Sequence, residues 1–243
     1  MKKKSKICVV IPSYKVRDLI EKVIRKIDFR IVNKVIIVDD CCPEKTGSYL
    51  KKKKYKNLIV LINKNNMGVG AATLQGFKKA IQMKFDIVFK IDGDNQHEPR
   101  DLQKFIKLMQ KPEVNFCKGT RFKNSLEKRK IPFIRLIGNT VLTYLCRINC
   151  RNNNLTDVVN GFIGIKLNLL KKLNFNQISN DFFFEEDLLF RISFIEKKIY
   201  ELPIRVIYNN KSNLNPIKII LPFILKHMRN FFIRLKHDFS IKG

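Results

Sequence analysis

Short runs of apolar, largely β-branched residues alternate with longer stretches of helical periodicity through the first half of the chain. This alternation is typical of a mostly parallel sheet covered by helices on both faces. The pattern predicts strands at Ile7 to Ile11, Lys34 to Val38, Leu58 to Ile62, Asp86 to Ile91 and Asn115 to Lys118. It predicts helices at Asp18 to Ile27, Val69 to Lys84 and Pro99 to Gln110. We therefore expect an α/β fold with a Rossmann-like sheet.

The second half of the chain is less regular. Its pattern predicts helices at Ile131 to Cys146 and Glu185 to Lys197. Strands are expected at Gly161 to Lys166 and near Tyr200 to Tyr208. These elements extend the predicted sheet and its helical cover.

The chain changes character at its C-terminal end, from Asn215 to Phe239. Apolar residues recur there with basic residues between them, which predicts a basic amphipathic helix, broken or kinked near Pro222. The apolar stripe consists of Ile220, Ile224, Met228, Phe231, Leu235 and Phe239, and the basic residues are Lys218, Lys226, Arg229, Arg234 and Lys236. We expect a catalytic domain over residues 1–213 and a segment over 214–243 suited to a membrane surface.

Composition adds a strong positive charge to this pattern. The chain has 49 Lys and Arg against 21 Asp and Glu, a formal net charge of +28. An anionic membrane surface or a polyanion such as nucleic acid would suit this charge. The abundance of Lys, Ile and Asn is equally typical of compositional drift in an AT-rich genome, so both interpretations stay open. No nucleic-acid-binding module is evident, and nucleic acid is not expected as the partner.

The cysteines and the hydropathy indicate the compartment. The six cysteines have no paired CxxC spacing, which argues against a structural zinc site. No export sequence precedes the first predicted strand, and no apolar run reaches the roughly 18 residues that a membrane-spanning helix needs. We expect a reduced protein in the cytoplasm, peripheral on the inner face of the cell membrane.

Polar residues follow several predicted strands at the points where ligands bind in open α/β sheets. Asp92 and Asp94 stand two residues apart after an apolar strand, with Gly93 between them. Carboxylate oxygens on such a rigid edge suit a hard divalent cation that bridges a diphosphate. An Asp-x-Asp motif can also be an ordinary acidic turn. Here the motif follows a buried strand in an alternating α/β pattern, which favours a metal site.

Two further segments lie at predicted strand ends. Asp39 and Asp40 could accept hydrogen bonds from a base or ribose, or could cap a turn. Gly68 and Gly70 stand at a strand-to-helix turn, where small residues allow close approach of backbone to a ligand.

Taken together, the motifs resemble glycosyltransferase family 2 enzymes of GT-A fold, particularly the branch of polyprenyl-phosphate (dolichol-phosphate) sugar synthases. The resemblance runs from Ile7 to about Asn213. The motifs occur in the family's order as VVIPSYK, VIIVDD, NMGVGAA, KIDGDNQHEP, KGTRF, RLIGN, DVVNGF, FFFEEDLLFRI and KSN.

The resemblance implies a role for each matching residue. Pro12, Tyr14, Asp39 and Asp40 would hold the nucleotide, while Asp92 and Asp94 would hold Mg²⁺ or Mn²⁺ and the diphosphate. Arg121 would contact a phosphate or the substrate, and Asp157, Asn160 and Gly161 would line the acceptor side. The chain departs from the family at Cys41-Cys42 and at Asn95, which leaves the metal pair intact. Gln75 stands where many relatives place a basic residue toward the diphosphate, so the resemblance implies that the metal, Lys90 or Arg121 neutralises more of the donor's charge.

The acidic run Glu185, Glu186 and Asp187 offers bases, because inverting transfer to a hydroxyl requires removal of its proton. The family pattern matches Asp187 best and Glu185 next. An acidic first helical turn that complements the helix dipole is the structural alternative. A phosphate acceptor is already ionised near neutral pH and needs no strong base.

We therefore expect an inverting glycosyltransferase that moves a sugar from a nucleotide-diphosphate donor to a membrane-presented polyprenyl phosphate. The enzyme alternative is a transferase acting on a surface polysaccharide or lipopolysaccharide. The alternative from another class is a basic nucleic-acid-binding protein whose acidic pair is structural.

Overall fold

The computed structural model describes residues 5–123, 126, 131–207 and 216–242. Within these residues, seven strands form one mixed sheet in the order β3-β2-β1-β4-β6-β5-β7. Strand pairs β1-β2, β2-β3, β1-β4 and β5-β7 are parallel, whereas β6 runs antiparallel to β4 and β5. The strands are β1 Ile7–Ser13, β2 Lys34–Asp39, β3 Leu58–Ile62, β4 Ile87–Lys90, β5 Phe116–Thr120, β6 Ile163–Lys166 and β7 Tyr200–Pro203. The prediction of a mostly parallel sheet in an α/β fold is confirmed.

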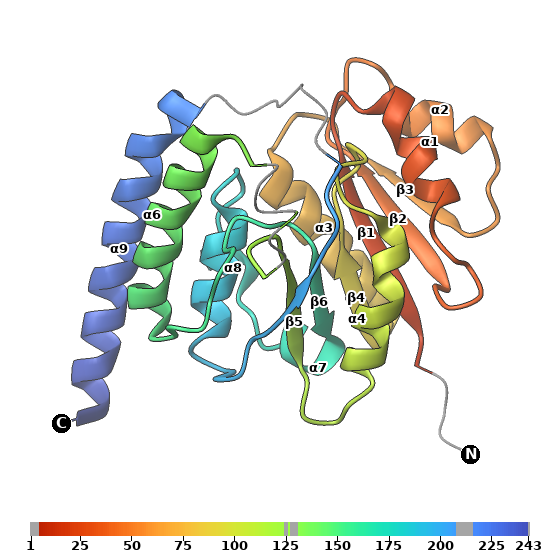
Figure 1. Ribbon diagram of the computed structural model, residues 1–243. Coiled ribbons are helices and arrows are strands. Elements are labelled where there is room, and N and C mark those ends of the chain that lie inside the picture. The colour runs from red at the N-terminus through yellow and green to blue at the C-terminus, as the bar shows by residue number, and fades with distance from the viewer. Residues whose placement is uncertain (1–4, 124–125, 127–130, 208–215, 243) are drawn as a thin grey trace.

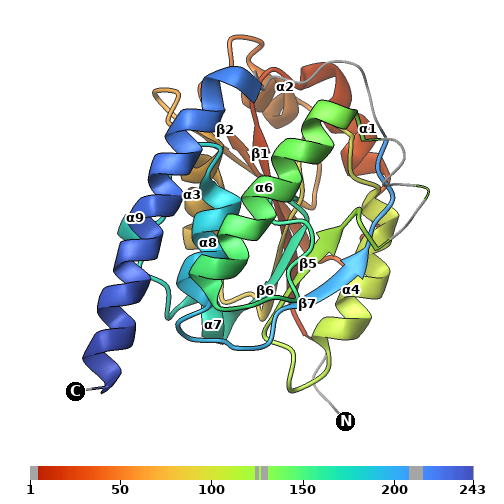
Figure 2. The same ribbon diagram turned by 60° about the vertical axis from the view of Figure 1, so that its left-hand side comes forward.

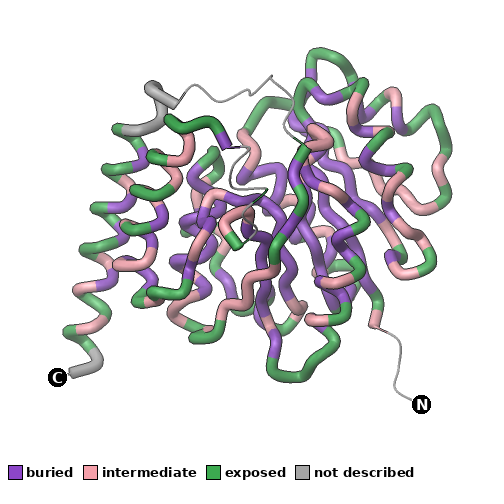
Figure 3. Tube along the Cα trace, viewed as in Figure 1, coloured by how far each residue is buried: buried purple, intermediate pink, exposed green. Residues whose placement is uncertain are grey.

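Helices cover both faces of the sheet (Figure 1). One face packs against α1 Arg17–Arg25, α2 Thr46–Lys52 and α4 Leu102–Met109, the last preceded by the 3₁₀ turn η1 Pro99–Asp101. The other face packs against α3 Val69–Gln82, α7 Leu167–Leu170 and α8 Phe184–Ile192. A second 3₁₀ turn, η2 Phe175–Gln177, precedes α8. The central strands are buried from both sides (Figure 3), as continuous apolar runs in a parallel sheet require.

Helices α6 Phe133–Cys150 and α9 Pro216–Lys242 form an outer layer over α8, side by side (Figure 2). Helix α9 continues through Pro222 as one helix, so it is not broken there, and the alternative of a kink at Pro222 stays a prediction. Its buried residues are Phe223, His227, Asn230 and Arg234, while most of its described apolar residues are exposed. The helix therefore docks through a largely polar face.

Several predicted boundaries differ from the structure. Helix α2 was not predicted, because its sequence TGSYLKK has no helical periodicity of apolar residues. Helix α8 ends at Ile192 and strand β7 at Pro203, both earlier than predicted. The predicted boundary between residues 213 and 214, and the KSN motif, lie outside the described residues, as do the side chains of Lys218 and Ile220.

Candidate active site

The carboxyl ends of β1, β2 and β4 meet at one edge of the sheet, because these strands are parallel neighbours. Ser13 lies opposite Asp39 in the register, and the backbone N–H of Asp40 donates to the Ser13 carbonyl at 3.0 Å. On the other side of β1, Lys90 lies opposite Val10, so Asp92 follows two residues beyond the last paired position. The sheet thus brings the predicted nucleotide and metal segments together.

The turn after β4 presents Asp92 and Asp94. Asp94 accepts a hydrogen bond from the Gln96 backbone N–H at 3.0 Å, and Asn95 adopts a left-handed conformation with φ of 60°. Burial and the neighbouring Asp92 carboxylate raise the pKa of Asp94 to about 6. The two carboxylates are therefore close enough to repel one another, and a divalent cation between them would relieve this repulsion.

His97 supports the same turn. Its Nδ1 accepts a hydrogen bond from the Asp92 backbone N–H at 3.3 Å, and its ring packs edge-on against Phe162 with 5.6 Å between the ring centroids. Burial lowers the pKa of His97 to about 4, although the nearby Asp92 carboxylate acts in the opposite direction. The imidazole is therefore neutral near pH 7, and its role is to hold the turn.

A buried lysine joins β4 to α8. The Nζ of Lys90 lies 2.6 Å from Asp92 Oδ1 and 2.7 Å from Glu185 Oε1. Burial alone would lower the pKa of Lys90, but the two carboxylates outweigh it and hold that pKa above its ordinary value. Gly161 leaves the room for this group, since a Cβ there would overlap Lys90 Nζ and lie 2.6 Å from Asp92 Oδ2. Lys90 therefore fixes Asp92 and Glu185 relative to each other.

Asp39 and Asp40 are buried, and their carboxylates hold two loops. Asp39 accepts hydrogen bonds from the backbone N–H groups of Cys42 and Gly47. Asp40 accepts from the Asn63 side chain at 2.8 Å and from the Gly68 backbone N–H at 2.7 Å. These bonds shape the loops after β2 and β3 at the predicted nucleotide side. Pro12 and the partly exposed Tyr14 lie at the adjacent end of β1.

The two glycines at the start of α3 are required by a close backbone approach. Gly68 has φ of 97°, and a Cβ there would lie 2.5 Å from the Asn180 carbonyl oxygen. A Cβ on Gly70 would overlap the Ser179 carbonyl oxygen, and the Ala71 N–H donates to the Asn180 carbonyl at 2.9 Å. The segment before α8 thus closes over the start of α3, which explains both glycines without a ligand.

Arg121 and Asp157 form a two-pronged ion pair. Arg121 Nε and Nη2 lie 2.8 and 2.7 Å from the two Asp157 oxygens, and the Arg121 backbone N–H donates to the same carboxylate at 2.9 Å. Burial would raise the pKa of Asp157, but the guanidinium outweighs it and lowers that pKa. The charge of Arg121 also reaches Asp92 and helps to lower its pKa. Asn160 lies beside this pair and accepts from the Phe162 N–H at 2.9 Å.

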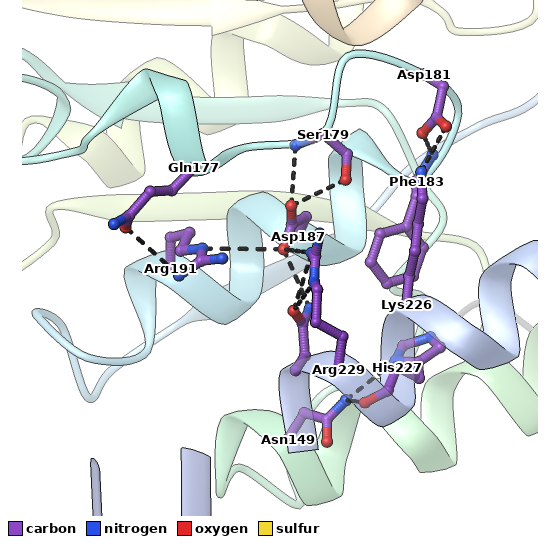
Figure 4. A network of polar contacts seen from close by, with 11 residues as sticks. Asn149, Gln177, Ser179, Asp181, Phe183, Asp187, Arg191, Lys226, His227 and Arg229 are labelled. Atoms are coloured by element: carbon purple, nitrogen blue, oxygen red, sulfur yellow. Dashed lines mark hydrogen bonds and ion pairs between the residues drawn. The ribbon is translucent and has the colours of Figure 1, made fainter. Parts of the chain in front are cut away.

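Asp187 lies away from these groups, on the α9 side of α8 (Figure 4). Its fully buried carboxylate accepts from the backbone N–H and the hydroxyl of Ser179, both at 2.9 Å. It also accepts from Arg229 Nη2 and Asn230 Nδ2, both at 3.1 Å. Glu185, two residues earlier, faces Lys90 instead. The structure thus brings Glu185, and not Asp187, to the Asp92 carboxylate.

One buried cation near the site, Lys118, was not predicted from the sequence. Lys118 in β5 is fully buried and donates to the backbone carbonyl of Asp157, whereas Lys90 in β4 pairs with the carboxylates of Asp92 and Glu185. A lysine inside an otherwise apolar strand is the available signal, because a buried charge needs a partner.

Comparison with known proteins agrees with this arrangement. The family model described as Glycosyl transferase family 2 matches residues 8–173. The chain is 26% identical over 231 residues to a UDP-N-acetylglucosamine--dolichyl-phosphate N-acetylglucosaminyltransferase of Methanococcus voltae, covering 89% of this chain and 92% of the relative. It is 24% identical over 177 residues to an undecaprenyl-phosphate mannosyltransferase of Micrococcus luteus, covering 70% of each.

Solved structures show the same fold. Glucosyl-3-phosphoglycerate synthase from Mycobacterium tuberculosis in complex with UDP superposes with a TM-score of 0.69 at 16% identity, covering 92% of this chain and 80% of that one. The complex of that enzyme with Mn²⁺, UDP and phosphoglyceric acid gives a TM-score of 0.68 at 14% identity, covering 95% and 78%. The predicted GT-A fold is confirmed. The family match spans more than half of the chain, and this chain therefore belongs to glycosyltransferase family 2.

Proposed function

We propose that this glycosyltransferase moves a sugar from a nucleoside diphosphate donor to a polyprenyl phosphate presented at a membrane surface. The observation that carries the donor side is the Asp92-Gly93-Asp94 turn at the carboxyl end of β4. The two relatives from Methanococcus and Micrococcus are named for polyprenyl-phosphate acceptors, which supports the acceptor class.

The donor set fits Mg²⁺ or Mn²⁺. Among the described residues, no group of three or more His, Cys, Asp or Glu side chains could hold a metal ion by itself. Two carboxylates with the remaining positions filled by diphosphate oxygens and water is the arrangement that Mg²⁺ commonly takes with nucleotides. A metal at Asp92 and Asp94 would supply Lewis-acid stabilisation of the departing nucleoside diphosphate.

The chain's own residues then orient this site. Burial would raise the pKa of Asp92, but the charge of Lys90 opposes it and the pKa is lowered, so Lys90 keeps the Asp92 carboxylate ionised and directed. Arg121 supplies a second positive group held by Asp157. A phosphate acceptor needs no proton removed near neutral pH, so Glu185 can serve through Lys90 as a positioning residue.

An exposed apolar surface supports presentation of the acceptor at a membrane. Helices α6 and α9 lie side by side and turn large hydrophobic residues to the outside. These residues, which we call the apolar surface, are Phe133, Ile134, Ile137, Val141 and Tyr144 on α6, and Leu221, Ile224, Leu225, Met228, Phe231, Phe232 and Phe239 on α9. Exposed hydrophobic residues gathered on two adjacent helices suit peripheral attachment on the inner face of the cell membrane. No helix within the described part of the chain is long and apolar enough to cross a bilayer.

The test is a turnover assay with a panel of nucleotide sugars and vesicles that contain a polyprenyl phosphate. We expect release of nucleoside diphosphate and formation of a glycosylated lipid, both dependent on the polyprenyl phosphate and on Mg²⁺ or Mn²⁺. Full turnover in excess chelator would contradict the metal role. If nucleoside diphosphate were released at the same rate with and without polyprenyl phosphate, polyprenyl phosphate would not be the acceptor.

A further inference from the structure

A pocket of about 420 Å³ opens between α8, α9 and the segment before α8, on the side where Asp187 contacts α9 (Figure 4). Its lining combines two guanidinium groups with neutral polar and aliphatic side chains. The lining includes Arg191, Arg229, Gln177, Ser179, Ile178 and Ile233. None of these side chains contacts the Asp92 and Asp94 turn, which we call the donor site.

Arg191 carries hydrogen-bond donors that the protein does not use. Its Nε is buried without a hydrogen-bond partner, and its Nη1 reaches Gln177 only at 3.4 Å. The closest carboxylate oxygen, on Asp187, is 3.9 Å from Nε. Burial lowers the pKa of Arg191 below its ordinary value, and Arg229 adds to this effect while Asp187 opposes it. The pocket thus holds a desolvated guanidinium that lacks a hydrogen-bonding anion.

The local charge balance favours an added anion. Asp187 is the carboxylate that pairs with both arginines, so the described groups around the pocket carry one net positive charge. The Asp187 oxygens already accept hydrogen bonds from Ser179, Arg229 and Asn230 (Figure 4). They are therefore occupied on the protein side. Arg229 also donates from Nε and Nη2 to Asn230 Oδ1, at 3.2 and 3.0 Å, so the donors left for a ligand among the described contacts are on Arg191 and on Arg229 Nη1.

A guanidinium matches the geometry of a phosphate better than that of a point anion, because its planar fork can donate two parallel hydrogen bonds to the phosphate oxygens. Arg191 would supply this fork, and Arg229 would add its Nη1 donors and its charge. The position of the pocket indicates where such a phosphate would come from. Leu225 and Phe232, both in the apolar surface, lie four residues before and three residues after Arg229, and so are its neighbours on the helix. The pocket therefore opens at the edge of the apolar surface, where lipid headgroups would lie.

We propose that Arg191 and Arg229 form a phosphate-binding site, separate from the donor site, that takes the phosphate of an anionic lipid headgroup or a free phosphate. The lipid source rests on the proposed attachment of the apolar surface to a membrane. Phosphate recognition by the two guanidinium groups does not depend on it.

The most informative variant keeps the positive charge at both positions and removes the planar guanidinium groups. General attraction to an anionic surface depends on charge and would be the same for Lys and Arg, whereas two-pronged hydrogen bonding requires Arg. We would compare wild type with Arg191→Lys/Arg229→Lys. The matched control is Arg151→Lys, which makes the same change at an exposed arginine that pairs with Asp238 on α9.

Two measurements distinguish the sources. The first is the thermal midpoint in inorganic phosphate against chloride at equal ionic strength, without vesicles. The second is co-sedimentation with vesicles of phosphatidylglycerol in phosphatidylcholine against phosphatidylcholine alone. We expect the double variant to bind at least about tenfold more weakly than wild type in one or both assays, because Lys cannot make the two-pronged hydrogen bonds to phosphate that Arg makes. The Arg151→Lys control should match wild type.

Loss in the vesicle assay identifies a lipid headgroup, and loss with inorganic phosphate alone identifies a free phosphate. Equal binding of wild type and the double variant in both assays would overturn the site, whatever the turnover on polyprenyl phosphate. Failure of wild type to bind any vesicle, with phosphate binding lost in the variant, would refute the membrane attachment and leave the site standing. Should the variant not fold, the Nε–Hε resonance of Arg191 in wild type must shift on titration with phosphate, and an unchanged resonance would overturn the proposal.

Discussion

Three consecutive carboxylates at the start of α8 enter three different environments. Glu185 contacts Lys90, Glu186 is buried with both oxygens lacking a hydrogen-bond partner, and Asp187 contacts α9. Successive helical positions are about 100° apart, so each side chain faces a different neighbour. Only the first of the three reaches the candidate active site.

Glu186→Gln is expected to stabilise the protein. Burial, together with the nearby Glu185 carboxylate, raises the pKa of Glu186 to about 8 from an ordinary 4.5. Between these pH values the folded protein keeps a proton that the unfolded chain releases, so this group makes stability fall as pH rises. The glutamine removes that dependence, and the gain in thermal midpoint should be several degrees larger at pH 8 than at pH 5, as followed by calorimetry.

The same substitution one residue earlier provides the control for Glu186→Gln. Glu185→Gln removes a carboxylate that pairs with buried Lys90 and should lower the midpoint. If Glu186→Gln lowered the midpoint equally, Glu186 would have a partner that stabilises its charged form.

Asp94→Asn is expected to lower turnover by more than about 10²-fold, because Lewis-acid stabilisation of the leaving group is worth several kcal/mol. The fold should survive, since Asp94 is partly exposed and its one described side-chain hydrogen bond is to the Gln96 N–H. Nucleoside diphosphate release measures the effect. Asp18→Asn, a change at an exposed carboxylate on α1, should leave turnover intact. Equal rates for the two variants would remove Asp94 from the metal site.

The sequence predicts the position of a residue well when that residue directly follows a predicted strand. Asp92 and Asp94 follow a strand directly, and parallel strands bring their carboxyl ends together, so their place at the sheet edge could be predicted. The contact between Lys90 and Glu185 joins residues 95 apart in the chain, and it depends on how α8 packs against β4. No local pattern reports that packing.

At the scale of elements, α8 connects the donor side to the outer layer. Asp187 bonds Ser179 on one side and Arg229 and Asn230 of α9 on the other. The segment that includes Ser179 and Asn180 closes over Gly68 and Gly70 at the start of α3. Docking of α9 is thus linked through Asp187 to the loop that Asp40 holds.

Asp187→Asn is expected to destabilise the protein by roughly 1–3 kcal/mol, because it removes a fully buried carboxylate that accepts hydrogen bonds from Ser179, Asn230 and the half-exposed Arg229. Turnover of the folded fraction, compared on phosphate and hydroxyl acceptors, should fall by less than tenfold on both. A general base contributes about 10²- to 10⁴-fold, so a loss of that size confined to hydroxyl acceptors would make Asp187 the base. Urea unfolding and initial rates below the midpoint separate the two effects.

Helical periodicity predicted α9 and its apolar stripe, but it could not show which face docks. Met228 and Phe239 are exposed, whereas Arg234, predicted among the basic residues between the apolar ones, is buried and donates to the Asn149 carbonyl at 2.9 Å. A pattern of apolar positions indicates burial only if the protein supplies the apolar neighbour. Here the neighbours in and around α6 and α8 supply carbonyl, hydroxyl and carboxylate groups together with aromatic rings, and these suit His227, Asn230 and Arg234.

At the scale of the molecule, the apolar surface and the excess of basic residues would act together at an anionic bilayer. Each buried apolar side chain adds roughly 1.5–3 kcal/mol before ordering costs, and each Lys or Arg near the surface adds about 1 kcal/mol. The first contribution is independent of salt and the second is screened by it. The net charge of +28 by itself is explained equally well by compositional drift and by an anionic partner surface. The exposed hydrophobic residues on adjacent helices favour the second explanation, with a membrane as the surface.

Met228→Ser/Phe232→Ser is expected to weaken co-sedimentation with anionic vesicles at every salt concentration, because both side chains are exposed in the apolar surface. Lys236→Gln should weaken it mainly at low salt. Met83→Ser changes an exposed methionine at the end of α3 and should have no effect. Equal recovery of wild type and the double variant would show that the apolar surface does not enter the bilayer.

In most helices of soluble proteins the buried positions are apolar and the exposed positions, which are polar, tolerate substitution. In α9 the buried positions are largely polar and the exposed positions are hydrophobic. His227, Asn230 and Arg234 each meet specific partners, so few other side chains could replace them. Outward positions such as Ile224 and Phe232 meet no such constraint, and any large hydrophobic side chain could occupy them. In a library of variants of α9, the polar positions should therefore be the invariant ones, and the hydrophobic positions should exchange freely among Leu, Ile, Met and Phe.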